Sequence, residues 1–426
     1  MRTWNDLYKM LKNGEMDQSL IQTGCEDINA YRTRATEVMN GFEKTFGVKE
    51  DTLVVLCSAP GRTEICGNHT DHQHGHVLAA AVNLDFLACV SPNGTQTVHF
   101  QSEGWPMTTV DLSDLKPQEA EKETTASLVR GVMAELAKAG YTIGGFDMYA
   151  VSNVLPGSGL SSSAACEILL GVAGNHLFCQ DELDAVTLAK IGQKAENQYF
   201  GKPSGLMDQT ASSVGDAVAI DFADPSAPIV RSVTANLEEL GLALCIVDCG
   251  ADHAALTGEY ASIPQEMEKV AAFFGKKVLR EVQEEEVLKA MPQLRRAVGD
   301  RAVLRALHFY ADDRRAMEEA DALERRDRDT FLQLVKESGR SSWELLQNIT
   351  PAGAVEAQDM AVALVAAETA LNGRGACRVH GGGFAGTIQA FVPTESVSEF
   401  CEKMELMLRK GCCHVLNIRP AGGIVL

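Results

Sequence analysis

A glycine- and serine-rich segment, NVLPGSGLSSSAAC at residues 153–166, precedes an apolar stretch and is the strongest candidate for chemistry in the chain. Gly157 and Gly159 let the backbone approach a ligand closely, and the hydroxyls of Ser161–Ser163 lie beside the free N–H groups of a predicted helix start. These groups and the positive end of the helix dipole bind anions, so the segment predicts a phosphate cradle. A glycine-rich turn with a serine N-cap would show a similar pattern. The chain has no GxxxxGK[ST] loop, so a phosphate would be held without that motif's lysine.

Two carboxylates follow within GQKAENQYFGKPSGLMDQTASSVG, residues 192–215. Glu196 lies in a predicted helix, and Asp208 comes after a Gly-Lys-Pro turn, next to Leu206 and Met207. A carboxylate in such apolar surroundings needs a partner. The alternative is that Asp208 is the N-cap of a following helix.

A histidine-rich segment, APGRTEICGNHTDHQHGHV at residues 59–77, contains four of the ten histidines of the chain. Zinc binding is one interpretation, because His69, Asp71, His72, His74 and His76 are acceptable ligands by type, although no HExxH spacing occurs. In the other interpretation, His69 and Asp71 face a polar pocket, where an ionised carboxylate accepts hydrogen bonds from two hydroxyls of a polyol.

The elements that must position these segments alternate between helix and strand. Helical periodicity covers residues 1–47, a strand is predicted at 53–59 with Pro60-Gly61 closing it, and apolar strand runs alternate with helices between 77 and 222. The two prolines of 223–230 predict a boundary, followed by a strand, charged amphipathic helices over 262–348, and a return to strands in the last 50 residues. A triple-glycine turn, in RVHGGGFAGTIQAFV at 378–392, enters one of these late strands. The pattern is typical of an α/β or α+β protein.

Composition limits the class of partner. The 426 residues include 58 acidic and 38 basic ones, a formal charge of −20, which excludes a wrapped nucleic acid and an anionic membrane surface. The length predicts two domains. The longest apolar run, residues 77–90, is interrupted by polar residues and is shorter than the about 20 residues of a membrane span. The polar amino terminus resembles no secretory signal, and twelve scattered cysteines without a CxxC pair predict reduced thiols. We therefore expect a cytoplasmic protein without a disulfide framework.

Taken in order, the segments resemble motifs of the GHMP kinases, and most closely those of the galactokinases. The first resembles PGRxNxIGEHTDY at Pro60, Gly61, Arg62, Gly67, His69, Thr70 and Asp71. Residues 156–165 resemble PxGxGLSSSAA, residues 195–198 and 205–209 resemble AENQ and GIMDQ, and residues 378–386 resemble RMTGGGFGG. HAALTGEY, residues 253–260, resembles a segment that ends in a sugar-contacting tyrosine. The resemblance runs from about residue 55 to the carboxyl end.

The resemblance implies an α+β, two-domain fold with the active site between the domains. It implies an ATP-binding domain at 51–225 of the ribosomal-protein-S5-like kind and a ferredoxin-like α/β sandwich domain at 226–426 with a four-stranded antiparallel sheet. The helical extension at 1–50, predicted from periodicity, is not covered by the resemblance. The implied activity is ATP-dependent phosphorylation of a sugar, galactose first, at its anomeric hydroxyl. The implied ligands are the small-molecule sugar, ATP and Mg²⁺.

The resemblance also implies a role for each matched residue. The residues matched to the ATP-binding loop are Gly157, Ser158, Gly159, Leu160, Ser161, Ser162 and Ser163, and those matched to Mg²⁺ binding are Ser163 and Glu196. The residues matched to the sugar site are Asn68, His69, Thr70, Asp71, Gly205 and Tyr260. Asp208 is matched to the catalytic carboxylate and Arg62 to its partner. An arginine lowers the pKa of a neighbouring aspartate, so we expect Asp208 to orient the anomeric hydroxyl and to accept its proton late.

Departures from the motifs concern the substrate. Asn68 replaces the glutamate of GEHTDY, and His72 replaces its tyrosine. An asparagine can donate a hydrogen bond to a carboxylate that a glutamate would repel, and DHQHG also resembles galacturonokinase. Galacturonate and arabinose, a pentose without C6, are therefore alternative substrates. A non-catalytic sugar sensor is a further alternative. The presence of Asp208 and Glu196 argues against it, because a sensor would be expected to lack such residues. The pattern leaves the oligomeric state and the role of residues 1–50 open.

Overall fold

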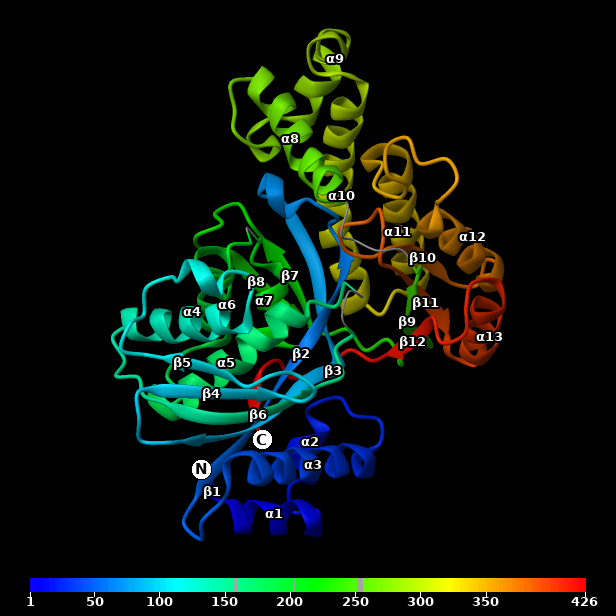
Figure 1. Ribbon diagram of the computed structural model, residues 1–426. Coiled ribbons are helices and arrows are strands. Elements are labelled where there is room, and N and C mark those ends of the chain that lie inside the picture. Colours follow the sequence, from blue (N-terminus) through cyan, green and yellow to red (C-terminus); the bar gives the residue numbers. More distant parts are fainter. Residues whose placement is uncertain (156–158, 203, 251–255) are drawn as a thin grey trace.

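The computed structural model describes residues 1–155, 159–202, 204–250 and 256–426 of the chain (Figure 1). The described residues form two sheets with helices packed on both. One sheet has nine strands and the other has four, and helices cover the faces of each. The fold is therefore α+β, as predicted.

The nine-stranded sheet is organised around a long antiparallel pair, β2 (Leu53–Cys66) and β3 (His76–Pro92). Strands β1, β2, β3, β6, β4 and β5 follow one another across it, β13 pairs with β2, and β7 joins β3 to β8. The remaining strands of this sheet are β1 (Arg2–Thr3), β4 (Thr97–Ser102), β5 (Thr108–Asp111), β6 (Phe146–Ser152), β7 (Ala217–Asp221), β8 (Ile229–Val233) and β13 (Ile424–Val425). All these pairs are antiparallel except β4 with β6.

Strand β2 corrects one prediction. We expected Pro60-Gly61 to close the strand, but β2 continues through them to Cys66. The register with β3 shifts between Pro60 and Arg62, and such a bulge accommodates a proline that has no N–H for the ladder. The continuation brings Arg62 and Glu64 into the region between the two sheets.

Two groups of helices cover opposite faces of the large sheet (Figure 1). One group is α4 (Thr125–Lys138), α5 (Ser162–Phe178), α6 (Ala185–Ala195) and α7 (Met207–Val214). The other is the amino-terminal group α1 (Trp4–Asn13), α2 (Asp17–Ile21) and α3 (Ile28–Phe46). Alternation along β2 separates the two cores, because Val55 and Cys57 pack with the first group and Val54 and Leu56 with the second. Residues 1–50 thus cover an apolar face of the sheet.

A buried aspartate fastens the amino-terminal helices to the sheet. Asp85 of β3 is fully buried and accepts a hydrogen bond from the Tyr31 hydroxyl of α3 at 2.6 Å. It also pairs with Arg34 of α3, and with Arg419 near the carboxyl end at 3.1 Å. Burial alone would raise the pKa of Asp85, but the two guanidinium groups outweigh burial and hold this pKa below its usual value. Residues from both ends of the chain therefore meet at one carboxylate.

The four-stranded antiparallel sheet has the order β10 (Ala376–Val379), β11 (Thr387–Pro393), β9 (Leu242–Asp248) and β12 (Cys413–Leu416). Its outer face is covered by α12 (Asp359–Leu371) and α13 (Val397–Met407). Its inner face packs toward α10 (Asp300–Glu324), α11 (Arg328–Ser341) and β2. Helices α8 (Thr257–Phe273) and α9 (Glu284–Val298) pack against α10 at one end of the molecule (Figure 1). The four-stranded antiparallel sheet was predicted.

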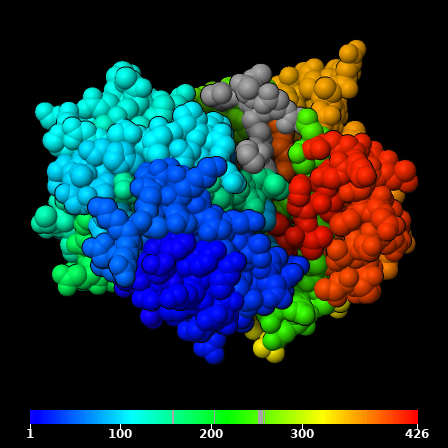
Figure 2. Space-filling model, turned by 60° about the horizontal axis from the view of Figure 1, so that its bottom comes forward, coloured from blue at the N-terminus to red at the C-terminus, as the bar shows by residue number. Residues whose placement is uncertain are grey.

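In the space-filling view of Figure 2, the dark blue amino-terminal part of the chain adjoins the cyan part, and the red and orange carboxyl-terminal part lies on the other side of the molecule. The division of the chain into domains at 225/226 stays a prediction. Strands β8 and β13 follow that position in the sequence, yet both belong to the large sheet. Over the ranges described, no helix is long and apolar enough to cross a membrane.

Candidate active site

A polar cavity of about 260 Å³ lies where β2, the segment after it, the loop before α7 and the triple-glycine turn meet. Its walls are formed by Arg62, Glu64, Asn68, His69, Asp71, His72, Lys202, Ser204, Gly205, Met207, Asp208, Gly381 and Gly382. Three of the four motif segments singled out in the sequence contribute to this list, and the start of α5 contacts Asp208 from beside it. The tertiary structure therefore brings all four segments together.

Asp208 is held at both carboxylate oxygens. Arg62 Nε donates to Oδ1 at 2.7 Å, and the Ser161 hydroxyl donates to Oδ2. Burial alone would raise the pKa of Asp208, but Arg62 and the hydrogen bond from Ser161 outweigh burial and hold it below the ordinary value. Leu206 is the N-cap of α7, so Asp208 lies within the first turn and the N-cap alternative is wrong. The carboxylate is ionised and faces the cavity.

The described part of the glycine-serine loop lies directly beside Arg62 and Asp208. Gly157 and Ser158 lie outside the described residues. Arg62 uses its backbone N–H to bond Leu160 O at 3.0 Å and its guanidinium to bond Gly159 O. Gly159 has a φ of 73°, and a Cβ there would lie 3.1 Å from His380 Nδ1, so a glycine suits this position.

The start of α5 differs from an ordinary serine cap. Ser161 precedes the helix with a φ of 55°, and its side chain makes no capping bond because the hydroxyl is directed to Asp208. The first N–H groups of α5, at Ser162 and Ser163, therefore keep no side-chain cap. An anion at this helix end would meet free N–H groups, the dipole and the half-buried hydroxyls of Ser162 and Ser163.

Glu196 and Ser163 form a second polar group beside the loop. The Ser163 hydroxyl donates to Glu196 Oε1 at 3.1 Å, and Lys202 Nζ lies 3.0 Å from the same oxygen. Glu196 is 1% exposed and begins a π-helical turn, Glu196–Phe200. Ser204 and Gln209 donate to its other oxygen, the latter at 2.9 Å. A hydroxyl and a carboxylate are oxygen ligands that suit Mg²⁺, and the Lys202 ammonium already occupies a cation position there, so these residues fit the ion.

Asp71, His69 and Gly205 form another part of the cavity wall. A Cβ on Gly205 would lie 2.5 Å from Asp71 Oδ2, so the missing side chain gives the carboxylate its room. His69 has a φ of 61° and its Nε2 lies 3.0 Å from Gly382 O. Burial lowers the pKa of His69 to about 4, and the neighbouring His72 adds to this effect. The imidazole ring is therefore neutral, and its Nε2 donates the hydrogen bond to Gly382 O. These two side chains present a carboxylate and an imidazole to the cavity.

Asn68 lines the cavity as expected, but its side-chain amide is already bonded to protein groups. Asn68 Nδ2 donates to Glu64 Oε1 at 2.8 Å and to Gly381 O at 2.6 Å, and its Oδ1 accepts from Asn348 Nδ2 at 2.7 Å. The Thr70 hydroxyl is buried and bonds the carbonyl of Gly67 at 2.8 Å.

Tyr260 lies behind the triple-glycine turn. Its hydroxyl donates to Gly383 O at 2.9 Å and its ring packs edge-on against Phe384. Neither Thr70 nor Tyr260 is among the described residues that line the cavity. Both residues hold the loops that form the cavity, and direct sugar contacts by them stay predictions.

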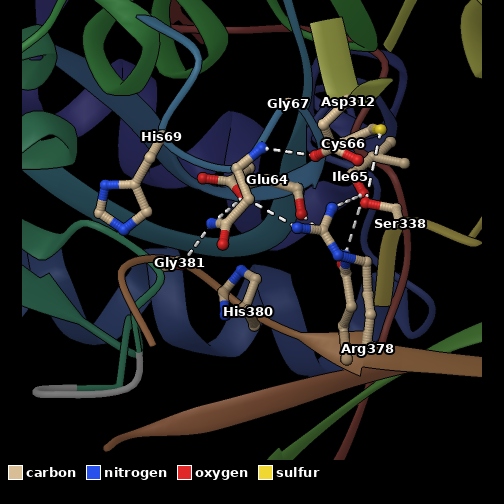
Figure 3. Close-up of polar contacts among 12 residues, drawn as sticks. Glu64, Ile65, Cys66, Gly67, His69, Asp312, Ser338, Arg378, His380 and Gly381 are labelled. Atoms are coloured by element: carbon tan, nitrogen blue, oxygen red, sulfur yellow. Dashed lines mark hydrogen bonds and ion pairs between the residues drawn. The ribbon is translucent and has the colours of Figure 1, made fainter. Parts of the chain in front are cut away.

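Glu64 and Arg378 are site residues that sequence reasoning missed (Figure 3). Arg378 of β10 is fully buried, donates to Ile65 O, and its Nη2 lies 3.3 Å from Glu64 Oε1. Burial outweighs Arg378, Arg62 and the bond from Asn68, and raises the pKa of Glu64 to about 7. Glu64 follows Arg62 by two residues on one strand, so strand alternation from Arg62 could have found it.

The zinc interpretation of the histidine-rich segment is not supported. His76 bonds Asp313 Oδ1 at 3.0 Å and lies 3.3 Å from Asp221, away from the cavity wall formed by His69 and His72. Over the described part of the chain, the side chains that cluster closely enough to hold a metal are three cysteines elsewhere. His69 and Asp71 instead face the polar cavity, as the polyol interpretation predicted.

Comparison with solved structures defines the class of protein. The crystal structure of Lactococcus lactis galactokinase complexed with galactose superposes with a TM-score of 0.78 at 24% identity, covering 92% of this chain and 100% of that one. The Methanococcus jannaschii mevalonate kinase superposes with a TM-score of 0.61 at 13% identity, covering 87% and 99%. The family described as "GHMP kinases N terminal domain" matches residues 127–216. The fold is that of a GHMP kinase.

Sequence comparison narrows the family. The family described as "Galactokinase galactose-binding signature" matches residues 40–92. The galactokinase of Actinobacillus pleuropneumoniae is 32% identical over 346 residues, which cover 80% of this chain and 85% of that protein. The galactokinase of Streptomyces coelicolor is 32% identical over 368 residues, covering 85% and 90%. The chain belongs to the galactokinase family, and the predicted resemblance is confirmed.

Proposed function

We propose that the protein is an ATP-dependent galactokinase, which transfers the γ-phosphoryl group of ATP to the anomeric hydroxyl of galactose and releases ADP. The observation that carries the proposal is the Asp208 carboxylate, held by Arg62 Nε at 2.7 Å and by Ser161, between the cavity and the start of α5. An acceptor hydroxyl in the cavity would lie on one side of this carboxylate and a phosphate at the helix end on the other. The names of the relatives support the same activity.

Asp208 orients the acceptor in this proposal. An ionised carboxylate accepts a hydrogen bond from the anomeric hydroxyl, and the low pKa of Asp208 makes it a weak base. The proton therefore moves to Asp208 late, when the new O–P bond has already made the hydroxyl acidic. Arg62 stabilises the charge that develops on the transferring group and keeps the carboxylate in place.

Phosphate binding is assigned to the loop and to the start of α5. Ser161, Ser162 and Ser163, with Gly159 and Leu160 before them, would surround the phosphates, and Gly157 and Ser158 belong to the same assignment although they lie outside the described residues. Ser163 and Glu196 would hold Mg²⁺, which when bound neutralises charge on the β- and γ-phosphate oxygens. Lys202, 3.0 Å from Glu196, would turn from the carboxylate toward phosphate as the cation takes its place.

The cavity favours galactose over galacturonate. The alternative rested on Asn68 donating to a uronate carboxylate, but both amide hydrogens of Asn68 are already donated to Glu64 and Gly381 O. Asp71 also lines the cavity and would repel a uronate carboxylate placed beside it. Asp71 and His69 would instead bind neutral sugar hydroxyls, and Asn68 would act by fixing the Glu64 carboxylate in the wall.

An ADP-release assay with galactose, galacturonate, arabinose and N-acetylgalactosamine tests the proposal. We expect the highest kcat/KM with galactose and little turnover of galacturonate. Absence of turnover with every sugar, together with a rise in Tm on adding galactose, would show a sensor in place of an enzyme. Arabinose turnover above that of galactose would overturn the substrate assignment alone.

Asp208→Asn tests the role of the carboxylate. It removes the charge and keeps the shape, so we expect kcat to fall by about 10²–10⁴-fold while galactose still raises Tm. Asp184→Asn is the matched control, because Asp184 caps α6 by accepting from Thr187 N at 2.7 Å and an asparagine caps equally well. Turnover of Asp208→Asn within a few-fold of the parent protein would contradict the mechanism.

A further inference from the structure

Three cysteine side chains from distant parts of the chain meet on the outer face of the four-stranded sheet. Cys245 comes from β9, Cys413 from β12 and Cys401 from α13. The three Sγ atoms all lie within 4.8 Å of one another, and those of Cys401 and Cys413 are 3.2 Å apart. The active-site proposal uses none of them.

The sheet register explains why the thiols converge. Val415 of β12 lies opposite Cys245 of β9, and Cys413 lies opposite Val247, so the two cysteines are diagonal neighbours on one face. That face packs against α13, which places Cys401 above the pair. Cys245 is fully buried, whereas Cys401 and Cys413 are half-buried. The group is therefore built by two strands and a helix and has one side open to solvent.

The distances suit a metal better than a disulfide. A disulfide joins two sulfurs at about 2.05 Å and would leave the third thiol unused. Zinc binds thiolates at about 2.3 Å, so three sulfurs around one ion lie about 3.8–4.0 Å apart. Sulfurs within 4.8 Å of one another reach that arrangement with shifts of less than about 1 Å. The described residues add no fourth ligating side chain to the group, so water would complete the coordination from the open side.

We propose that Cys245, Cys401 and Cys413 form a binding site for one thiophilic cation, with Zn²⁺ as the ion it takes. Thiolate ligands select Zn²⁺ over Mg²⁺ and Ca²⁺, which prefer oxygen. The site is separate from the kinase site, because Leu244 and Ile246 alternate to the inner face, toward β2, while Cys245 and Val247 face α13. The bound ion would tie α13 to β9 and β12 at the edge of the sheet.

Zinc titration of the full-length protein tests the proposal. The protein is reduced, freed of metal with a chelator, and titrated with Zn²⁺ against a chromophoric competitor. We expect one Zn²⁺ per chain and at least tenfold weaker binding in Cys401→Ser, with no comparable binding of Mg²⁺. Cys25→Ser is the matched control, because Cys25 is also half-buried but lies near the amino-terminal helices, and its variant should bind as the parent does.

Three further measurements keep the test independent of folding and of the kinase reaction. Galactose turnover by Cys401→Ser should equal that of the parent, and Cys413→Ser should lose zinc in the same way. Zn²⁺ should also protect Cys401 from alkylation in the parent protein. The proposal is overturned if the parent binds no stoichiometric Zn²⁺, if Cys401→Ser binds it unchanged, or if peptide mapping finds Cys401 and Cys413 joined as a disulfide that reductant does not open.

Discussion

Gly205→Ala tests whether the room left by a missing side chain sets the position of Asp71. The added Cβ would lie 2.5 Å from Asp71 Oδ2, whereas ordinary contacts begin at 3.4 Å, so the carboxylate must move by about 0.9 Å. Gly205 has no left-handed φ, so alanine brings no backbone strain and the effect is confined to this contact. The change therefore acts on the proposed sugar site and leaves the loop backbone intact.

A displacement of about 1 Å in a positioning group costs up to about 10²-fold in rate, and rotation of the carboxylate reduces that loss. We expect kcat/KM for galactose to fall about 10–100-fold, which corresponds to about 1.4–2.7 kcal/mol. The KM for galactose should rise and the KM for ATP should not change, because the loop at α5 is untouched. Steady-state kinetics with each substrate varied in turn measures both constants.

Gly171→Ala is the matched control. Gly171 is a helical glycine in α5 whose Cβ would lie 3.6 Å from Leu188 Cδ2, an ordinary contact, so its kinetics should equal those of the parent. If Gly205→Ala keeps the kcat/KM for galactose within about twofold of the parent, Asp71 is not positioned by this contact, and the assignment of Asp71 and Gly205 to the sugar site fails.

Two further predictions concern stability. Tyr31→Phe removes the 2.6 Å bond to the buried Asp85, so the free energy of unfolding in urea should fall by about 1.5–3 kcal/mol. Tyr141→Phe, which loses an exposed bond to Glu182, should change it by less than about 1 kcal/mol, and equal losses would contradict the role of Asp85. The pKa of Glu64 is about 7 in the folded protein and about 4.3 in the unfolded chain. Between about pH 4.3 and about pH 7 the folded state therefore binds more protons at this group than the unfolded state does. The contribution of Glu64 to the free energy of unfolding consequently falls as the pH rises through this range. Glu64→Gln should remove this pH-dependent contribution to the free energy of unfolding. If the difference in unfolding free energy between the parent and Glu64→Gln does not vary from pH 4.5 to 7.5, Glu64 does not have the raised pKa.

The positions of the main helices and strands, and the residues around Asp208, follow from local rules. A glycine-serine loop before an apolar run predicted the start of α5, and short apolar runs predicted β6, β7, β9 and β11. Arg62 and Asp208 were paired through motifs whose spacing is preserved, and the structure places them 2.7 Å apart. The helix start and the strands depend on neighbours a few residues away, which the sequence displays directly. The Arg62–Asp208 pair joins residues far apart in the chain and was implied only by the family resemblance.

The extent of β2 was not predictable in this way. A proline and a glycine normally end a strand, and here a bulge against β3 lets the strand continue. The continuation depends on the partner strand and not on the residues of β2 alone. The continuation also places Glu64 in the cavity wall. Because the strand was predicted to end before Glu64, this site residue was not predicted.

The sequence by itself determined the family, the order of the motifs and the pairing of Arg62 with Asp208. Only the tertiary structure decided that Asn68 is bonded to Glu64 and Gly381 O, which supports the proposed preference for galactose over galacturonate. Only the tertiary structure, likewise, brings Cys245 of β9 close to Cys401 of α13. The physical reason is that contacts between residues far apart in the chain depend on how the sheets and helices pack, and packing is selected by the burial of whole faces rather than by any local spacing.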